Sequence, residues 1–160
     1  MTYAIEAWYP SQVLQNSIEC VKKFAAKLTT NDFKPPYPTL LEKVDWKSIS
    51  RITMERRAVI VYNYAQDRRT LPDNAIVLRS TESSRHSQRI GHGMELTMPV
   101  TRLEAVLSTS LNTARRIWNT LLAELVAIAS PERFKVAVKD PAVYAHLINK
   151  NAVRNVELAV

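Results

Sequence analysis

Glycine is nearly absent from this chain, and the shortage limits the folds that it can form. The 160 residues include two glycines, Gly91 and Gly93. Tight turns between strands and loops that hold phosphate groups often need glycine, because it accepts positive φ angles and lets a ligand approach the backbone. A sheet-rich fold and a glycine-rich phosphate loop are therefore disfavoured. We expect a fold that is mainly α with a small β component.

The length and composition of the chain indicate one folded domain. Hydrophobic residues make up 46% of the chain and charged residues 23%, as in proteins that form a packed core. Within a single domain over residues 1–160, we expect an N-terminal helical part over residues 10–66 and a second part over residues 94–160. The sequence has one cysteine, no secretion signal and no apolar run of membrane-spanning length. We therefore expect a cytoplasmic protein without a membrane contact.

An apolar stripe predicts a long helix over residues 11–29. Its members recur at alternating spacings of four and three: Leu14, Ile18, Val21, Ala25 and Leu28. This spacing places them on one side of a helix. We expect the stripe to pack on the protein's own core. A homodimer through this helix is the alternative use of the heptad-like spacing.

Further along, helices and turns are indicated by proline and by capping residues. Three prolines in residues 30–38 predict a loop. Thr39 and Glu42 then suggest a capping box at the start of a short helix. We expect a helix over residues 48–66, although residues 58–62 would also suit a buried strand.

A brief strand is expected over residues 75–78 and a polar loop over residues 80–93. Near the C-terminus, Asp140 and Pro141 have the positions of an N-cap and a first helical residue, which predicts a terminal helix.

Two helices joined by a polar turn are indicated over residues 101–128. Thr101 and Glu104 suggest a second capping box, and a Ser-Thr-Ser run then interrupts the first helix, with Ser110 or Asn112 as the cap of the next. The second helix has apolar residues at helical spacing: Ala114, Ile117, Trp118, Leu121, Leu125 and Ile128. These side chains should face the core.

The opposite side of this second helix is polar. Asn112, Arg116 and Asn119 lie at helical spacing, with Arg115 beside them. Arginine pairs with the acceptors of guanine in the major groove, and asparagine pairs with adenine. The face therefore predicts contacts with DNA bases, whereas two ordinary packed helices are the structural alternative.

Residues 103–121 resemble the helix-turn-helix of winged-helix bacterial regulators. The matching positions are core residues of the motif and the serine that opens the recognition helix: Leu103, Leu107, Leu121 and Ser110. The resemblance implies that Thr113 and Arg115 face DNA. The family often has glycine where this chain has Ser108.

A winged domain would also need two strands after the recognition helix. Residues 134–138 alternate in a way that suits one strand, which would pair with residues 95–98. A second strand candidate is missing from the sequence. The expected architecture is thus a helical domain that contains a helix-turn-helix. The sequence does not decide whether this domain is winged.

The charge of the chain favours an anionic partner. The net charge is +7, and residues 47–102 hold ten basic residues against five acidic ones, nine of the ten being arginine. Arginine binds phosphate with a planar fork of donors. We expect phosphate contacts from the arginines of this middle segment: Arg56, Arg57, Arg85 and Arg89.

Together these features predict a non-enzymatic protein that binds double-stranded DNA, either a transcriptional regulator or an accessory of replication or partition. The expected contact residues on the second helix are Ser110, Asn112, Thr113, Arg115, Arg116 and Asn119. The alternative is a protein-interaction adaptor or inhibitor that acts on a nucleic-acid-processing machine. A small nuclease is a weaker alternative, because Glu82 is not followed by the lysine that such a site would need.

No metal or cofactor is expected from the sequence. Cysteines and acids are not placed at ligand spacing beside the histidines. Cys20 lies near the apolar side of its helix, where we expect a small buried thiol.

Overall fold

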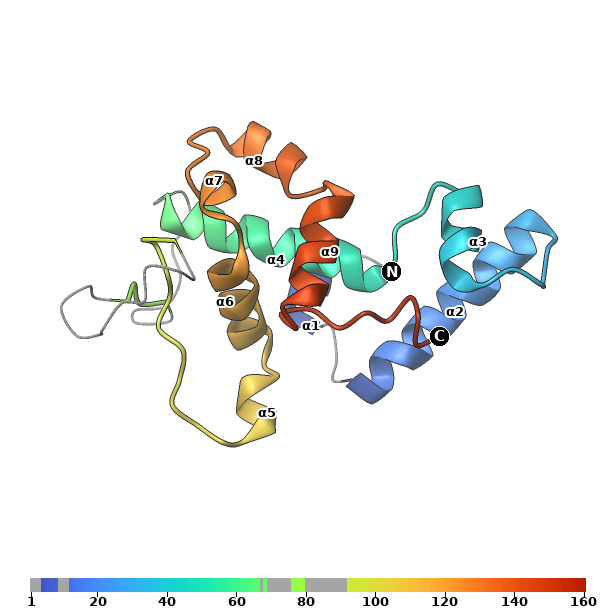
Figure 1. Ribbon diagram of the computed structural model, residues 1–160. Helices are drawn as coiled ribbons and strands as arrows, with labels where there is room; N and C mark the ends of the chain where they lie inside the picture. The colour runs from blue at the N-terminus through green and yellow to red at the C-terminus, as the bar shows by residue number, and fades with distance from the viewer. Residues whose placement is uncertain (1–3, 9–11, 67, 69–75, 80–91) are drawn as a thin grey trace.

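The protein is mainly helical in the computed structural model, which describes residues 4–8, 12–66, 68, 76–79 and 92–160 (Figure 1). The helices are α1 (Ile5–Trp8), α2 (Gln12–Thr30), α3 (Tyr37–Lys43), α4 (Ile49–Ala65), α5 (Glu104–Leu107), α6 (Ser110–Thr120), α7 (Ala123–Val126), α8 (Pro131–Ala137) and α9 (Pro141–Asn149). Within the described residues, β structure is limited to one antiparallel bridge between Leu78 and Leu96. The expected mainly α fold is confirmed.

The central helix is α4, which crosses the middle of the molecule and contacts α1, α2, α6 and α8. Its first turn is capped by the Ser48 side chain, which accepts a hydrogen bond from the Arg51 amide at 3.3 Å. Because α4 has neighbours on several sides, it does not need a single apolar stripe. The apolar residues 58–62, which would also suit a strand, lie within this helix.

Aromatic residues form the centre of the larger core. The rings of Tyr62 and Phe134 stack with their centroids 4.1 Å apart, and Trp118 is fully buried beside them. Two of these aromatic residues also bind the backbone: the Tyr62 hydroxyl donates to the Ile128 carbonyl at 2.7 Å, and the Trp118 indole donates to the Met94 carbonyl at 2.8 Å. The core therefore also holds the connecting segments in place.

The predicted wing strand at residues 134–138 is wrong, because most of this segment belongs to α8. Ser130 caps α8 with its side chain, and Pro131 occupies the first turn. Phe134 and Val138 are four residues apart and both fully buried. Their spacing matches one turn of a helix, so the apparent alternation of a strand is misleading here.

Both predicted capping boxes are also wrong. Helix α3 begins at Tyr37, with Pro36 as its N-cap, so Thr39 lies inside the helix. Helix α5 begins at Glu104 after Leu103, and no described side chain caps it. At α3 the fixed φ of proline suits the first helical turn, which explains the earlier start.

A buried carboxylate anchors α2. The Glu19 side chain is fully buried and accepts hydrogen bonds from the Tyr37 hydroxyl at 2.6 Å and from the Ser50 amide at 2.7 Å. These bonds join α2 to α3 and to the first turn of α4. A buried carboxylate without such partners would be costly, so they determine which side of α2 faces the protein.

The expectation that the apolar stripe of α2 packs on the protein's own core is therefore wrong for most of its members. Leu14, Val21 and Leu28 are exposed, and Ile18 packs on a small cluster around α1 and α4. Cys20 is exposed as well, and not a buried thiol. The physical reason is the position of Glu19, which brings the other side of the helix inward.

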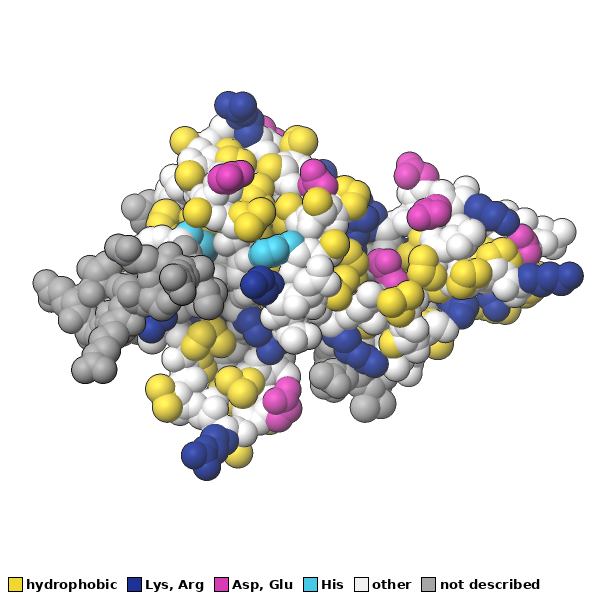
Figure 2. Space-filling view, viewed as in Figure 1, with side chains coloured by type: hydrophobic (Ala, Val, Ile, Leu, Met, Phe, Trp, Pro, Cys, Tyr) yellow, Lys and Arg dark blue, Asp and Glu magenta, His cyan; other side chains and the backbone are white. Residues whose placement is uncertain are grey.

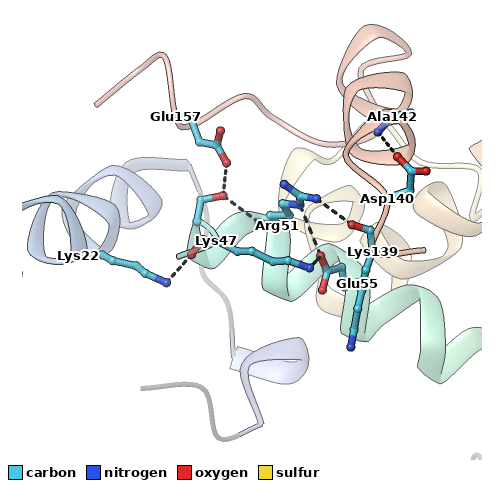
Figure 3. A network of polar contacts seen from close by, with 9 residues as sticks. Lys22, Lys47, Arg51, Glu55, Lys139, Asp140, Ala142 and Glu157 are labelled. Atoms are coloured by element: carbon cyan, nitrogen blue, oxygen red, sulfur yellow. Dashed lines mark hydrogen bonds and ion pairs between the residues drawn. The ribbon is translucent and has the colours of Figure 1, made fainter. Parts of the chain in front are cut away.

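Charged side chains tie the start of α4 to its surroundings (Figure 3). The Glu55 carboxylate lies 2.6 Å from the Lys47 ammonium group and 3.5 Å from the Arg51 guanidinium group. Arg51 also donates to the Lys139 carbonyl at 2.8 Å, before α9 begins. Lys22 of α2 donates to the Lys47 carbonyl, and burial lowers the pKa of Lys22 below its ordinary value.

Residues 150–160, which follow α9 and which we call the C-terminal segment, return along α2 (Figure 1). Arg154 donates to the Asn16 side chain of α2 at 3.0 Å, and the Ser48 hydroxyl donates to the Glu157 carboxylate. Val156 between them is fully buried. This C-terminal segment thereby brings residues from the end of the chain beside α2 and α4.

We predict that Glu19→Ala lowers the free energy of unfolding by about 2 to 4 kcal/mol, because the Tyr37 hydroxyl and the Ser50 amide lose their acceptor. Chemical denaturation followed by circular dichroism measures the loss. Glu42→Ala, at an exposed position of α3, is the control and should change stability by less than about 0.5 kcal/mol. Equal small losses in both variants would contradict the anchoring role of Glu19.

Candidate nucleic-acid interface

Helices α5 and α6 contact each other across a short polar turn. Thr109 is the N-cap of α6, and its hydroxyl oxygen accepts a hydrogen bond from the backbone N–H of Asn112 at 3.4 Å. We expected Ser110 or Asn112 as the cap, so the helix begins about where the sequence indicates but with another capping residue. The two short helices and the turn between them are present.

The buried side of α6 is largely as expected. Ala114, Ile117 and Trp118 are buried, and so is Leu121 directly after the helix. The helix does not continue to residue 128, because the backbone of Leu121 is extended and α7 follows separately. None of the α5 residues, all of which the structure describes, is buried.

The two asparagines of the predicted polar face bind the chain itself. Asn112 is buried, donates to the Val106 carbonyl at 2.7 Å and accepts from Arg115 at 2.8 Å. The side chain of Asn119 makes two hydrogen bonds to the backbone of Leu96, both at 2.7 Å. Its Oδ1 accepts from the Leu96 N–H, and its Nδ2 donates to the Leu96 carbonyl. These bonds occupy the amide groups that we expected to read bases, so their role here is to hold α5 and the segment around Leu96 against α6.

The other predicted contact residues lie in different environments. Arg57 of α4 is only 5% exposed and donates to the Ser110 hydroxyl at 3.1 Å. Arg56, its neighbour, is half-buried. Arg85 and Arg89 lie outside the described residues. Among the predicted phosphate contacts that the structure describes, Arg57 lies next to α6, where it binds Ser110.

A pocket of about 410 Å³ lies between α4, α5, α6 and the C-terminal segment. Three arginines line it, each from a different part of the chain: Arg57 of α4, Arg116 of α6 and Arg154 of the C-terminal segment. Among the described residues of its lining, the acidic one is Glu104, and Thr113 adds a hydroxyl group. The lining therefore carries an excess of positive charge.

The three arginines differ in exposure. Arg57 is buried, Arg154 is half-buried and Arg116 is exposed, so the positive charges reach from the interior to the surface. Figure 2 shows Lys and Arg side chains near the centre of the molecule, between α6 and the C-terminal segment. Arginine beside a low-dielectric wall attracts an anion more strongly than arginine in open water.

Sequence reasoning identified Arg57, Thr113 and Arg116 as contact residues, and all three line this pocket. It missed Arg154. The position of Arg154 depends on the return of the C-terminal segment along α2, which no local pattern in the sequence announces.

The described histidines have structural partners. The His92 ring nitrogen Nε2 lies 2.8 Å from the Trp118 carbonyl, and that of His146 lies 3.1 Å from the Thr120 carbonyl. The described residues include no cluster of His, Cys, Asp and Glu side chains that could hold a metal ion. Among the described helices, none is both long and apolar enough to cross a membrane.

Comparisons of the chain with protein-family models, with curated protein sequences and with solved structures find no match.

We predict that Asn119→Ala lowers the free energy of unfolding by about 1 to 3 kcal/mol, because the amide and the carbonyl of Leu96 lose their partner. Arg116→Ala, on the same helix but exposed, serves as the control and should cost less than about 0.5 kcal/mol. Urea denaturation measures both. Equal stability of the Asn119→Ala and Arg116→Ala variants would show that the Asn119 side chain does not stabilise the fold.

Proposed function

We propose that this protein is a non-enzymatic DNA-binding protein and that its arginine-lined pocket receives phosphates of the DNA backbone. The observation that supports the proposal is the convergence of Arg57, Arg116 and Arg154 on one pocket whose lining includes a single described acid, Glu104. Guanidinium groups bind phosphate oxygens through paired hydrogen bonds.

In this proposal the DNA lies across the mouth of the pocket, because a duplex is too wide to enter a space of about 410 Å³. The exposed Arg116 makes the outermost contact, and a phosphate oxygen reaches toward Arg154 and the Thr113 hydroxyl. The net charge of +7 speeds the encounter with a polyanion. Helices α5 and α6 form the helix-turn-helix of this proposal, with α6 facing the DNA.

The proposed contacts are with phosphates and not with bases. Phosphate contacts position a protein on DNA but do not carry sequence information directly. Because the Asn112 and Asn119 amides already bind the protein backbone, base reading by these residues is not part of the proposal. This favours an accessory of replication or partition over a regulator of one operator.

A protein-interaction adaptor is the second candidate function. The observation that favours it is the exposed apolar side of α2, which includes Leu14, Val21 and Leu28. Such a surface is typical of protein contacts. An adaptor of this kind would show no DNA binding even at low salt, which separates it from the first candidate.

We predict that Arg116→Ala weakens binding to a fluorescent DNA duplex roughly threefold to tenfold at low salt, to a similar degree on unrelated sequences. The slope of log K against log salt concentration should fall by about 1, because one phosphate contact is lost. Fluorescence anisotropy over a salt series, with duplex and single-stranded DNA, provides both values.

The matched control is Arg133→Ala, which removes an exposed arginine of α8 outside the pocket. Its salt slope should equal that of the unmodified protein. The proposal is contradicted if the unmodified protein does not bind DNA at low salt, or if the two arginine variants lose affinity equally.

A further inference from the structure

Helix α2 has an apolar face that no described part of the chain covers. Its residues, which we call the α2 seam, alternate at spacings of three and four: Leu14, Ser17, Val21, Phe24 and Leu28. The four apolar members are 52% to 58% exposed. Figure 2 shows hydrophobic side chains gathered over the lobe that α2 and α3 form. Single exposed apolar residues are common, but a continuous row of them indicates a contact surface.

The α2 seam cannot turn inward within one molecule. Glu19 and Ala26, on the opposite side of the helix, are fully buried, and the Glu19 carboxylate is bonded to α3 and α4. Arg154 binds Asn16 of α2 from the C-terminal segment. Rotation of the helix to bury the seam would expose Ala26 and leave the partners of Glu19 without an acceptor. A rotation of α2 therefore cannot cover the seam with the described part of the chain.

The spacing of the α2 seam is that of a helix that packs lengthwise against another helix. Leu14, Val21 and Leu28 occupy one core position of a heptad repeat, and Ser17 and Phe24 occupy the other. Glu19 and Ala26 then fall on the side farthest from the partner, which is the side that the structure buries in its own core. The same helix thus has one face for its own fold and one face for a second helix.

Charge on and beside the α2 seam favours a second copy of this chain as the partner. The seam itself contains no charged residue, and the positions that flank it are Ile18, Cys20, Ala25 and Lys27. Lys22 and Lys23 lie farther round the helix, where their ammonium groups bind the carbonyls of Lys47 and Val160. A partner helix with many acidic residues would meet little positive charge along the seam. Two identical seams, in contrast, bring almost no like charges together.

From these observations we infer that two copies of this protein associate through α2, seam against seam, around a twofold axis. An interface of this type is self-complementary, because the same residues are contributed by both copies. The seam is about 22 Å long for the fifteen residues from Leu14 to Leu28, so the interface is small and the dimer dissociates on dilution. The inference does not depend on DNA binding.

The test is sedimentation velocity of the full chain over a series of protein concentrations. The unmodified protein should shift from the monomer mass of 18.2 kDa to twice that mass as concentration rises. Val21→Glu and Phe24→Glu should each weaken association roughly tenfold or more, because each places a charge in the centre of the apolar contact. Circular dichroism of both variants verifies that the helices are retained.

Val136→Glu is the matched control, since Val136 is an exposed apolar residue on a different helix, α8. It should associate like the unmodified protein. The inference is overturned if the unmodified protein stays monomeric at every concentration, which would leave the α2 seam for a different protein. It is also overturned if Val136→Glu reduces association as much as the seam variants do.

Discussion

The buried carboxylate of Glu19 determines how α2 lies on the rest of the molecule. Its bonds to the Tyr37 hydroxyl and the Ser50 amide join three helices at one point. With this side of α2 inward, the C-terminal segment runs along the helix and Arg154 reaches the pocket that Arg57 also lines. The same arrangement leaves the α2 seam outward. The proposed DNA contact and the inferred dimer contact thus depend on one polar anchor.

The helices themselves could largely be predicted from the sequence. Asp140 and Pro141 begin α9 as expected, because an acceptor side chain followed by proline satisfies the first turn by local chemistry. The alternating apolar residues of α8 suggest a strand, but Phe134 and Val138 also lie one helical turn apart, and the signal that decides is the Ser130 cap. The buried face of α2 was not predictable, since the partners of Glu19 lie 18 and 31 residues away in sequence.

The candidate site was predictable in part, for similar reasons. Arg116 and Thr113 lie on the polar side of α6, which helical spacing identifies, and both line the pocket. Asn119 shares that polar side, but spacing cannot distinguish an amide that faces solvent from one that binds a distant backbone such as that of Leu96. Arg154 was missed because its place depends on tertiary contacts. Periodicity therefore identifies a polar face, and long-range packing decides which residues on it are available.

A map of backbone amide chemical shifts, recorded while a DNA duplex is added to the folded protein, identifies the residues that the DNA contacts. If the arginine-lined pocket binds DNA, the largest changes occur at residues that line it, among them Thr113, Arg116 and Asn155, with little change along α8. Salt should reverse these changes, because the contacts are with phosphates. Changes centred on α8, or no changes at low salt, would contradict the claim that this pocket binds DNA.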